Sequence, residues 1–246
     1  MKPGRKVVAG AAVVTFLVGV VTLFPARVVH RWFEPAGVVL SGVDGTVWSG
    51  TAQEMSAGGL YLYDVSWRLR PLRLFTGKLA LQVEGRSAAG VVDTGILIGF
   101  GRVVTLDDLR ADVRLQALQG IVDMPGLGGD ARAEFDRLAL RDGLPVAADG
   151  TVTITNLVAP MIYRGNIGDY EARFATTPEG IVASIEDVAA VVDLAAALSV
   201  YPDRRFEFLG KVGPTDRTPA EMRERMQFLG IADSQGRYEL RTEGRF

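Results

Sequence analysis

The pattern of apolar and polar residues divides the chain into one continuous apolar run and a long region of short alternating segments. The run, Val7–Phe24, contains no charged residue and directly follows a basic start that holds Lys2, Arg5 and Lys6. Its eighteen residues rise about 27 Å as a helix, close to the roughly 30 Å hydrocarbon thickness of a bilayer. The pattern therefore predicts a transmembrane anchor over residues 7–24, after a basic cytoplasmic tail over residues 1–6.

A cleaved secretory signal is the alternative interpretation of this N-terminal region. Such a signal has an apolar core of about 7–15 residues and ends at a small-x-small cleavage site. The present run is longer, and cleavage after Ala26 would place Phe24 where a small residue is needed. We therefore interpret the run as an uncleaved anchor, with residues 25–246 on the far side of the membrane from the cytoplasm.

Most of the region after the anchor alternates with a period of two residues, which is typical of strands. The segment Leu60–Leu69 predicts one strand with an apolar face made of Tyr61, Tyr63, Val65, Trp67 and Leu69. Further strands are predicted over Lys78–Glu84, Ala131–Leu140, Gly150–Asn156, Ala172–Thr176, Ile181–Ile185, Leu194–Val200, Phe206–Val212 and Arg237–Phe246. We expect two hairpins, with turns at Thr177-Pro178-Glu179-Gly180 and at Pro202-Asp203-Arg204.

The centre of the chain is less regular. The segment Leu106–Leu118 satisfies neither the helical nor the strand period throughout, and we interpret it as a strand. Glycine and proline then cluster at Met124–Gly129, which predicts a loop. Residues 25–246 would accordingly form one β-rich domain with two similar halves that meet near residues 124–130.

One short helix is predicted near the C-terminus. Thr218 is a suitable N-cap, Pro219 fits the first helical position, and Glu221 would complete a capping box. One apolar stripe follows at helical spacing, made of Met222, Met226 and Leu229. We expect this helix to cover one end of the sheet.

Charge and cysteine content narrow the class of function. Three of the 27 basic residues and none of the 29 acidic ones precede the anchor, so the remainder carries a net charge of −5. This balance argues against a nucleic-acid partner, because nucleic-acid modules carry a concentrated basic face. The absence of cysteine excludes a thiol nucleophile, a thiolate zinc site and disulfides.

The sequence contains no persuasive catalytic, cofactor or metal site. The single histidine, His30, lies close to the anchor, where we expect an interfacial side chain rather than part of a triad. Two carboxylate groupings, Asp107-Asp108 with Asp112 and Glu186-Asp187, are interpreted as solvated turn charges. The glycines of Gly95–Gly101 lack the Gly-Lys-Ser/Thr ending of a phosphate-binding loop and predict a relaxed apolar strand. We therefore expect no enzyme activity.

Four stretches resemble a known family. They are Leu40–Ala52, Val65–Pro71, Thr76–Leu79 and Met226–Tyr238, of which the first contains Gly-Thr-Val-Trp-Ser-Gly and the last Leu-Gly…Gly-Arg-Tyr. Together they resemble the N protein family of the bacterial type II secretion system. The resemblance implies a single-pass inner-membrane protein with a periplasmic, mostly β domain: a curved antiparallel sheet or half-barrel with a short helix near the C-terminus. It also implies partners in the assembly platform or the secretin, and no cofactor.

A looser resemblance leaves a second function open. Envelope proteins of the AsmA type also follow an N-terminal anchor with glycine-punctuated strands, and the segments Gly45-Thr46-Val47 and Gly150-Thr151-Val152 fit that style. This resemblance implies a lipid-binding protein whose curved sheet holds acyl chains. An open apolar concave face would favour lipid binding, and a filled core would favour a scaffold. Trp48 is expected in the core, with a partner contact as its alternative role.

Overall fold

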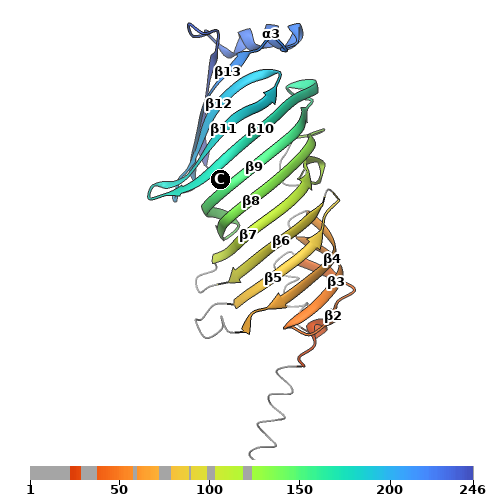
Figure 1. The fold of residues 1–246 in the computed structure, drawn as a ribbon. Coiled ribbons are helices and arrows are strands. Elements are labelled where there is room, and N and C mark those ends of the chain that lie inside the picture. Colours follow the sequence, from red (N-terminus) through yellow and green to blue (C-terminus); the bar gives the residue numbers. More distant parts are fainter. Residues whose placement is uncertain are drawn as a thin grey trace, which may run out of the picture.

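The protein forms one long antiparallel sheet that curves along its length (Figure 1). The computed structural model describes residues 23–28, 38–57, 60–71, 79–88, 90–98, 103–118 and 124–245. Within these ranges the sheet has fourteen strands. Thirteen of them follow one another as a meander, in the order β1-β3-β4 and so on to β14, and β2 pairs with β3 beside this path. The predicted curved, mostly β domain is therefore confirmed.

The strands lengthen towards the middle of the sheet. Their bounds are β1 Val38–Ser41, β2 Asp44–Gly45, β3 Ser49–Ala57, β4 Leu60–Leu69, β5 Leu79–Arg86, β6 Val91–Ile98, β7 Val103–Arg114, β8 Gly128–Arg141, β9 Leu144–Ala159, β10 Tyr163–Thr177, β11 Gly180–Ala190, β12 Val192–Val200, β13 Arg205–Pro214 and β14 Tyr238–Arg245. Short helical segments accompany the sheet: η3 Leu115–Leu118, α3 Ala220–Met226 and η4 Gln227–Leu229.

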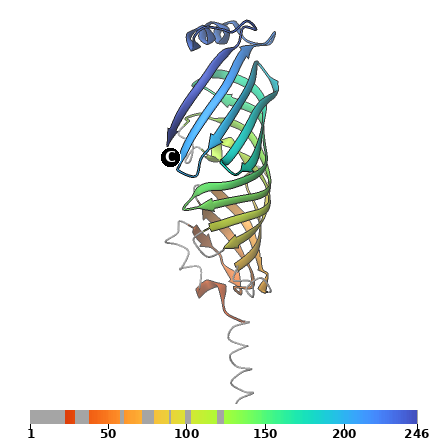
Figure 2. The same ribbon diagram turned by 90° about the vertical axis from the view of Figure 1, so that its left-hand side faces the viewer.

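The sheet rises as a column from the N-terminal strands to α3, and it remains open (Figures 1 and 2). The first strands lie at one end of this column and the helix lies at the other. The strands turn progressively as they stack, so the sheet forms a long trough with one concave side. In the described chain β1 and β14 do not pair with each other, and these two strands form the edges.

A β-bulge in β4 corrects the predicted face of that strand. Asp64 has a φ of 49°, and the register with β5 shifts between Tyr63 and Ser66. A bulge reverses the alternation of side chains, so Leu62 and Val65 are both buried while Tyr61 is exposed. The prediction that Tyr61 and Tyr63 share the buried face of Val65 is therefore wrong.

Similar bulges recur in other strands of the sheet. Asp108 in β7 and Asn156 in β9 have φ values of 51° and 53°, and each lies at a shift in register. Asp and Asn tolerate the left-handed region better than other non-glycine residues. Because bulges bend a strand and increase its twist, these positions help to curve the sheet.

Three separate apolar clusters follow the concave side of the described chain. One lies at the N-terminal end around Val65 and Val83, one in the middle around Phe135, and one under α3 around Ile167 and Tyr170. Many apolar side chains between these clusters are only half-buried, because no second sheet of described residues covers the trough. The core is therefore a strip along one face rather than a closed interior.

The irregular centre of the chain is part strand and part 3₁₀ helix. β7 confirms the predicted strand as far as Arg114. The last four residues of the prediction, Leu115–Leu118, form the 3₁₀ helix η3 instead. The loop predicted at Met124–Gly129 ends as β8 begins, and β7 pairs directly with β8 over eleven register positions. The sheet thus continues past this loop, and the existence of two similar halves stays a prediction.

The C-terminal helix exists, but it is capped differently from the prediction. Pro219 is the N-cap, and its ring has no polar group that could make a capping bond, whereas the Thr218 hydroxyl donates to the carbonyl of Val191. Met222 and Met226 are buried as expected, whereas Leu229 is 45% exposed. The predicted capping box and the third residue of the apolar stripe are therefore wrong.

The membrane anchor predicted over residues 7–24 lies almost entirely outside the described residues. Among the residues that are described, no helix is long and apolar enough to cross a membrane.

Candidate functional site

The Gly-Thr-Val-Trp-Ser-Gly segment forms a tight turn between β2 and β3. The Thr46 amide donates to the Ser49 carbonyl at 2.9 Å, and the Ser49 amide donates to Thr46 Oγ1 at 3.2 Å. Gly45 has a φ of 90°, and a Cβ there would lie 2.7 Å from the Ser49 carbonyl oxygen. Glycine is required at this position because a side chain fits neither the backbone angle nor the space.

This turn holds the segment that directly follows the apolar run. The Val47 amide donates to the Phe24 carbonyl at 3.0 Å, and Pro25 forms an isolated β-bridge with Thr46. Arg27 Nε donates to the Val43 carbonyl at 3.0 Å, and Ala26 is 5% exposed within the N-terminal apolar cluster. The end of the apolar run is thus built into the first strands rather than joined to them by a free linker.

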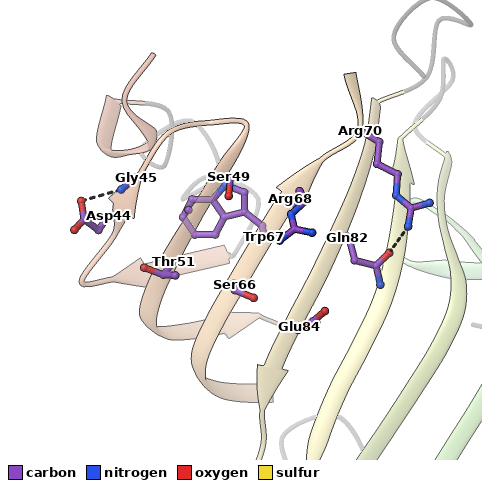
Figure 3. A pocket seen from close by; sticks show the side chains of 11 residues that line it. Asp44, Gly45, Ser49, Thr51, Ser66, Trp67, Arg68, Arg70, Gln82 and Glu84 are labelled. Carbon is purple, nitrogen blue, oxygen red and sulfur yellow. Dashed lines mark hydrogen bonds between the residues drawn. The ribbon is translucent and has the colours of Figure 1, made fainter. Parts of the chain in front are cut away.

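Trp67 fixes the same turn from the neighbouring strand (Figure 3). Its indole Nε1 donates to the Thr46 carbonyl at 3.2 Å, and a Cβ at Gly50 would lie 2.4 Å from its Cζ2 atom. Trp67 also packs against the N-terminal apolar cluster. Trp48 is only half-buried and belongs to none of the three clusters, so the prediction that it lies in the core is wrong. Trp67 packs against the core instead.

An open hollow of about 600 Å³ lies beside Trp67 and is lined mainly by polar groups (Figure 3). Arg70 Nη2 donates to Gln82 Oε1 at 3.2 Å, and Gln82 Nε2 donates to Asp93 Oδ1 at 2.6 Å. These three side chains therefore hydrogen-bond one another, and Asp44, Arg68 and Glu84 also line the hollow.

The concave side presents a continuous apolar surface from β8 to β14. In an antiparallel sheet, directly paired residues share one face. One such row of paired residues runs Ala133, Val152, Ala172, Ile185, Ala196, Gly210 and Leu240. Ile185 and Leu240 are half-buried, so this surface is partly open to solvent. We call this surface the apolar trough. It is an open strip along the sheet and not a closed pocket.

The C-terminal motif is organised by the Asp233 carboxylate. The backbone amides of Arg237 and Gln235 donate to Asp233 Oδ1 at 3.0 and 2.9 Å, and Lys211 Nζ lies 3.2 Å from Oδ2. These hydrogen bonds, with that from Arg237 as the largest cause, lower the pKa of Asp233 to about 2. The ionised carboxylate therefore shapes the loop that leads into β14.

The carboxylate groupings of the sequence have structural partners. Asp112 pairs with Arg132 at 2.8 Å, and Asp187 accepts a hydrogen bond from the Leu194 amide at 2.8 Å. Both groupings lie in strands, β7 and β11, so the prediction that they lie in turns is wrong. The described residues contain no group of His, Asp and Glu side chains arranged to hold a metal ion. His30 lies outside the described residues, as do positions 99–101 of the predicted glycine-relaxed strand, of which β6 contains the first part.

The two residues that organise the motifs have only weak signals in the sequence. Alternation puts Trp67 on an apolar strand face, but nothing in the sequence pairs it with Gly50, which lies seventeen positions away. Asp233 followed by Gly236 is a turn signal, which predicts the loop without predicting its hydrogen bonds.

Fold and site together define a class of protein: an open antiparallel β-sheet joined closely to the end of an N-terminal apolar segment. Comparison with known proteins gives the family. Residues 36–241 match the sequence profile described as "Type II secretion system (T2SS), protein N", so the chain belongs to the type II secretion system protein N family.

Curated relatives agree over nearly the full length. The chain is 26% identical to type II secretion system protein N of Aeromonas hydrophila, with 98% of both chains covered. It is 26% identical to the protein of the same name from Vibrio cholerae, with 93% of both chains covered, and 24% identical to that of Pectobacterium carotovorum, with 100% and 99% covered. No solved structure matches significantly.

Proposed function

We propose that this protein is a non-enzymatic inner-membrane component of the type II secretion system with a structural or assembly role. Residues 1–6 lie in the cytoplasm, residues 7–24 cross the inner membrane once, and the β domain stands in the periplasm. There it contacts subunits of the assembly platform or the secretin. Family membership supports the secretion role, and the basic start followed by an uncharged run supports the topology.

The joint between the apolar run and the sheet is the observation that carries a scaffold role. The bonds from Val47 to Phe24 and from Arg27 to Val43 leave no free linker at this point. A body attached in this way keeps a defined position relative to the membrane. This property suits a part that holds other subunits in place.

A fusion experiment tests the topology. A reporter that is active only in the periplasm is joined after the C-terminal residue, and a reporter active only in the cytoplasm is joined there in a matched strain. We expect activity from the periplasmic reporter alone. Activity of the cytoplasmic reporter in its place would refute the topology.

A crosslinking experiment tests the partners. Because the chain has no cysteine, a single Phe228→Cys substitution gives one site for a photoactivatable thiol probe. Phe228 is 90% exposed at the end of the column beside α3. We expect adducts with platform or secretin subunits, and Ser184→Cys on the outer surface of β11 serves as the control. Adducts only with lipid-transport proteins would contradict the scaffold role.

A junction variant tests the mechanical part of the proposal. Arg27→Ala removes the donor to the Val43 carbonyl and the contact with Asp44 at 3.4 Å. We expect less secreted substrate at an unchanged amount of protein, with Arg217→Ala at the opposite end as the control. Full secretion by Arg27→Ala would show that this bond does not matter to the function.

The apolar trough favours a second candidate function, the binding of lipid acyl chains. Its half-buried row is continuous over seven strands, and no second sheet of described residues bounds it. By the criterion of an open apolar concave face, this observation supports lipid binding. Met222 and Met226 close the trough only near α3.

Fatty acids that carry a photoactivatable group test this second function in intact cells. We expect labelling of the wild-type chain and a strong reduction in Ile185→Asp, which places a charge within the trough. Ser184→Asp introduces the same residue on the opposite face of β11 and should leave labelling unchanged. No labelling of the wild type would eliminate lipid binding.

A further inference from the structure

β14 is the last strand of the described sheet and lies at its edge. β14 pairs with β13 without any shift in register, and among the described residues no strand pairs with its other side. An unpaired strand edge presents a row of N–H and C=O groups that another strand can bind. Proteins commonly block such an edge with proline or a bulge, and β14 contains neither.

The outward side chains of β14 alternate in charge. Tyr238 and Leu240 pack on the concave side, so Glu239, Arg241 and Glu243 lie on the opposite face together with Arg245. All four of these charged residues are exposed. A row of one sign would repel a second strand, whereas this row of alternating sign can be matched by one.

We propose that the free edge of β14 binds β14 of a second copy of this chain, as an antiparallel pair with a two-fold axis at Thr242. In this register Glu239 lies opposite Arg245 of the other copy, and Arg241 lies opposite Glu243. All four outward pairs therefore join opposite charges. On the concave face Leu240 meets Gly244, over which the Phe206 ring of β13 packs.

The register is specific. Antiparallel pairs that keep both concave faces on one side can shift only in steps of two residues. A shift of two in either direction places Glu opposite Glu and Arg opposite Arg. Like charges directly opposite each other destabilise a sheet, so the neighbouring registers are disfavoured.

Pairing within one copy matches part of this charge, because Arg241 Nη2 lies 3.2 Å from Glu207 Oε1, but it leaves Glu243 and Arg245 directly opposite like charges. β13 places Glu207 opposite Glu243 and Arg205 opposite Arg245. A second copy supplies Arg241 beside Glu243 and Glu239 beside Arg245. The edge thus gains opposite charges where its own neighbouring strand provides like ones.

The pairing also constrains the orientation of the two bodies. The two-fold axis stands perpendicular to the sheet at β14, so the N-terminal segments leave the paired sheet at opposite ends. Both apolar runs enter one bilayer if this axis is normal to the membrane. The paired columns then lie along the membrane surface.

Cysteine scanning of the full-length chain in membranes tests the proposal directly. Residues at the two-fold axis face each other with Cα atoms about 4.5–5.5 Å apart, within the range that a disulfide spans. Thr242→Cys should therefore form a disulfide-linked homodimer under mild oxidation. Glu239→Cys alone should give no disulfide-linked dimer, and it should crosslink only when it is mixed with Arg245→Cys. Ser184→Cys is the negative control, because this exposed residue lies in β11, which is not an edge strand.

Charge reversal gives a second readout that does not depend on cysteine. The double variants Arg241→Glu with Arg245→Glu, and Glu239→Arg with Glu243→Arg, should each self-associate at least about tenfold more weakly than the wild type. Mixed together they should form heterodimers. Circular dichroism confirms that each variant is folded. A monomeric Thr242→Cys chain, unchanged association of the reversed variants, or a disulfide adduct of the Thr242→Cys chain with a different protein would each overturn the proposal.

Discussion

The rings of Phe135 and Phe174 meet across the strand that separates them, with their centroids 5.4 Å apart and their planes inclined by 51°. Gly150 of β9 lies between them in the same row and carries no side chain. A Cβ at Gly150 would lie 2.6 Å from the Phe135 Cα atom. The contact therefore links β8 to β10 directly and forms the centre of the middle apolar cluster.

Removal of one of these rings should weaken the whole sheet. Phe135 is 8% exposed, and Phe135→Ala should lower the free energy of unfolding by about 3–5 kcal/mol. Phe228→Ala makes the same change at a residue that is 90% exposed and should alter stability by less than about 0.5 kcal/mol. Urea titration followed by circular dichroism measures both. Equal effects would mean that the cluster does not support the fold.

Gly50→Ala tests the contact that holds the first turn. A methyl group there meets the Trp67 ring, and the resulting shift should cost about 1–3 kcal/mol. Gly95→Ala is the matched control, because a Cβ there has no contact shorter than 3.4 Å and should change stability by less than about 1 kcal/mol. The melting temperatures of the two variants, compared with the wild type, test this prediction. A melting temperature unaffected by Gly50→Ala would contradict the close contact.

Stability at alkaline pH should depend on Tyr170. Burial, with a smaller effect of Asp187, raises the pKa of its phenol from 10.0 to about 12. Below pH 10 the phenol is protonated in both states, and between pH 10 and 12 the unfolded chain ionises first, so stability is lost as pH rises. Tyr170→Phe should reduce the loss measured when the pH is raised from about 8 to about 11, whereas Tyr61→Phe at an exposed site should not. Identical alkaline profiles for wild type and Tyr170→Phe would exclude this assignment.

Stability in acid should depend on Asp233 in the opposite sense. Its pKa is lowered from 3.8 to about 2, so its contribution is present above pH 3.8 and is lost as pH falls towards 2. Asp233→Asn should be less stable than the wild type near neutral pH, and the difference should shrink towards about pH 2. Ser234→Ala removes a side chain that does not titrate and should keep the acid dependence of the wild type. A constant difference at every pH would argue that the charge is irrelevant.

Alternation in the sequence predicts most strands, because a half-buried sheet needs apolar residues at every second position. It fails at Asp64, where the bulge moves Tyr61 to the other face. A single aspartate does not distinguish a bulged strand from a regular one, because its conformation depends on the neighbouring strand. The open trough has the same origin: the alternation predicts an apolar face, but only the order and curvature of the strands decide whether another layer covers it.

The helix near the C-terminus shows a second kind of limit. Thr218 has the sequence context of an N-cap, yet its hydroxyl binds Val191, which lies 27 positions earlier in the chain. A long-range hydrogen bond competes here with the local one, and local patterns contain no information about it. The two family motifs are recognisable from their residues alone, but their structural roles are not. Gly50 leaves space for the Trp67 ring, and the Gly236 amide donates to the Asp233 carbonyl.

The meander order has a consequence for how the protein is made. From β3 onwards, each strand pairs with the strand synthesised just before it, and no later strand of the described chain is inserted between two earlier ones. A chain that crosses a membrane from its N-terminal end can therefore add one strand at a time as it emerges, starting from the turn that fixes Phe24. Each step closes only a short loop, which keeps its entropic cost low. With the topology proposed above, folding and translocation can thus proceed together, and β14 is the last of the described strands to pair.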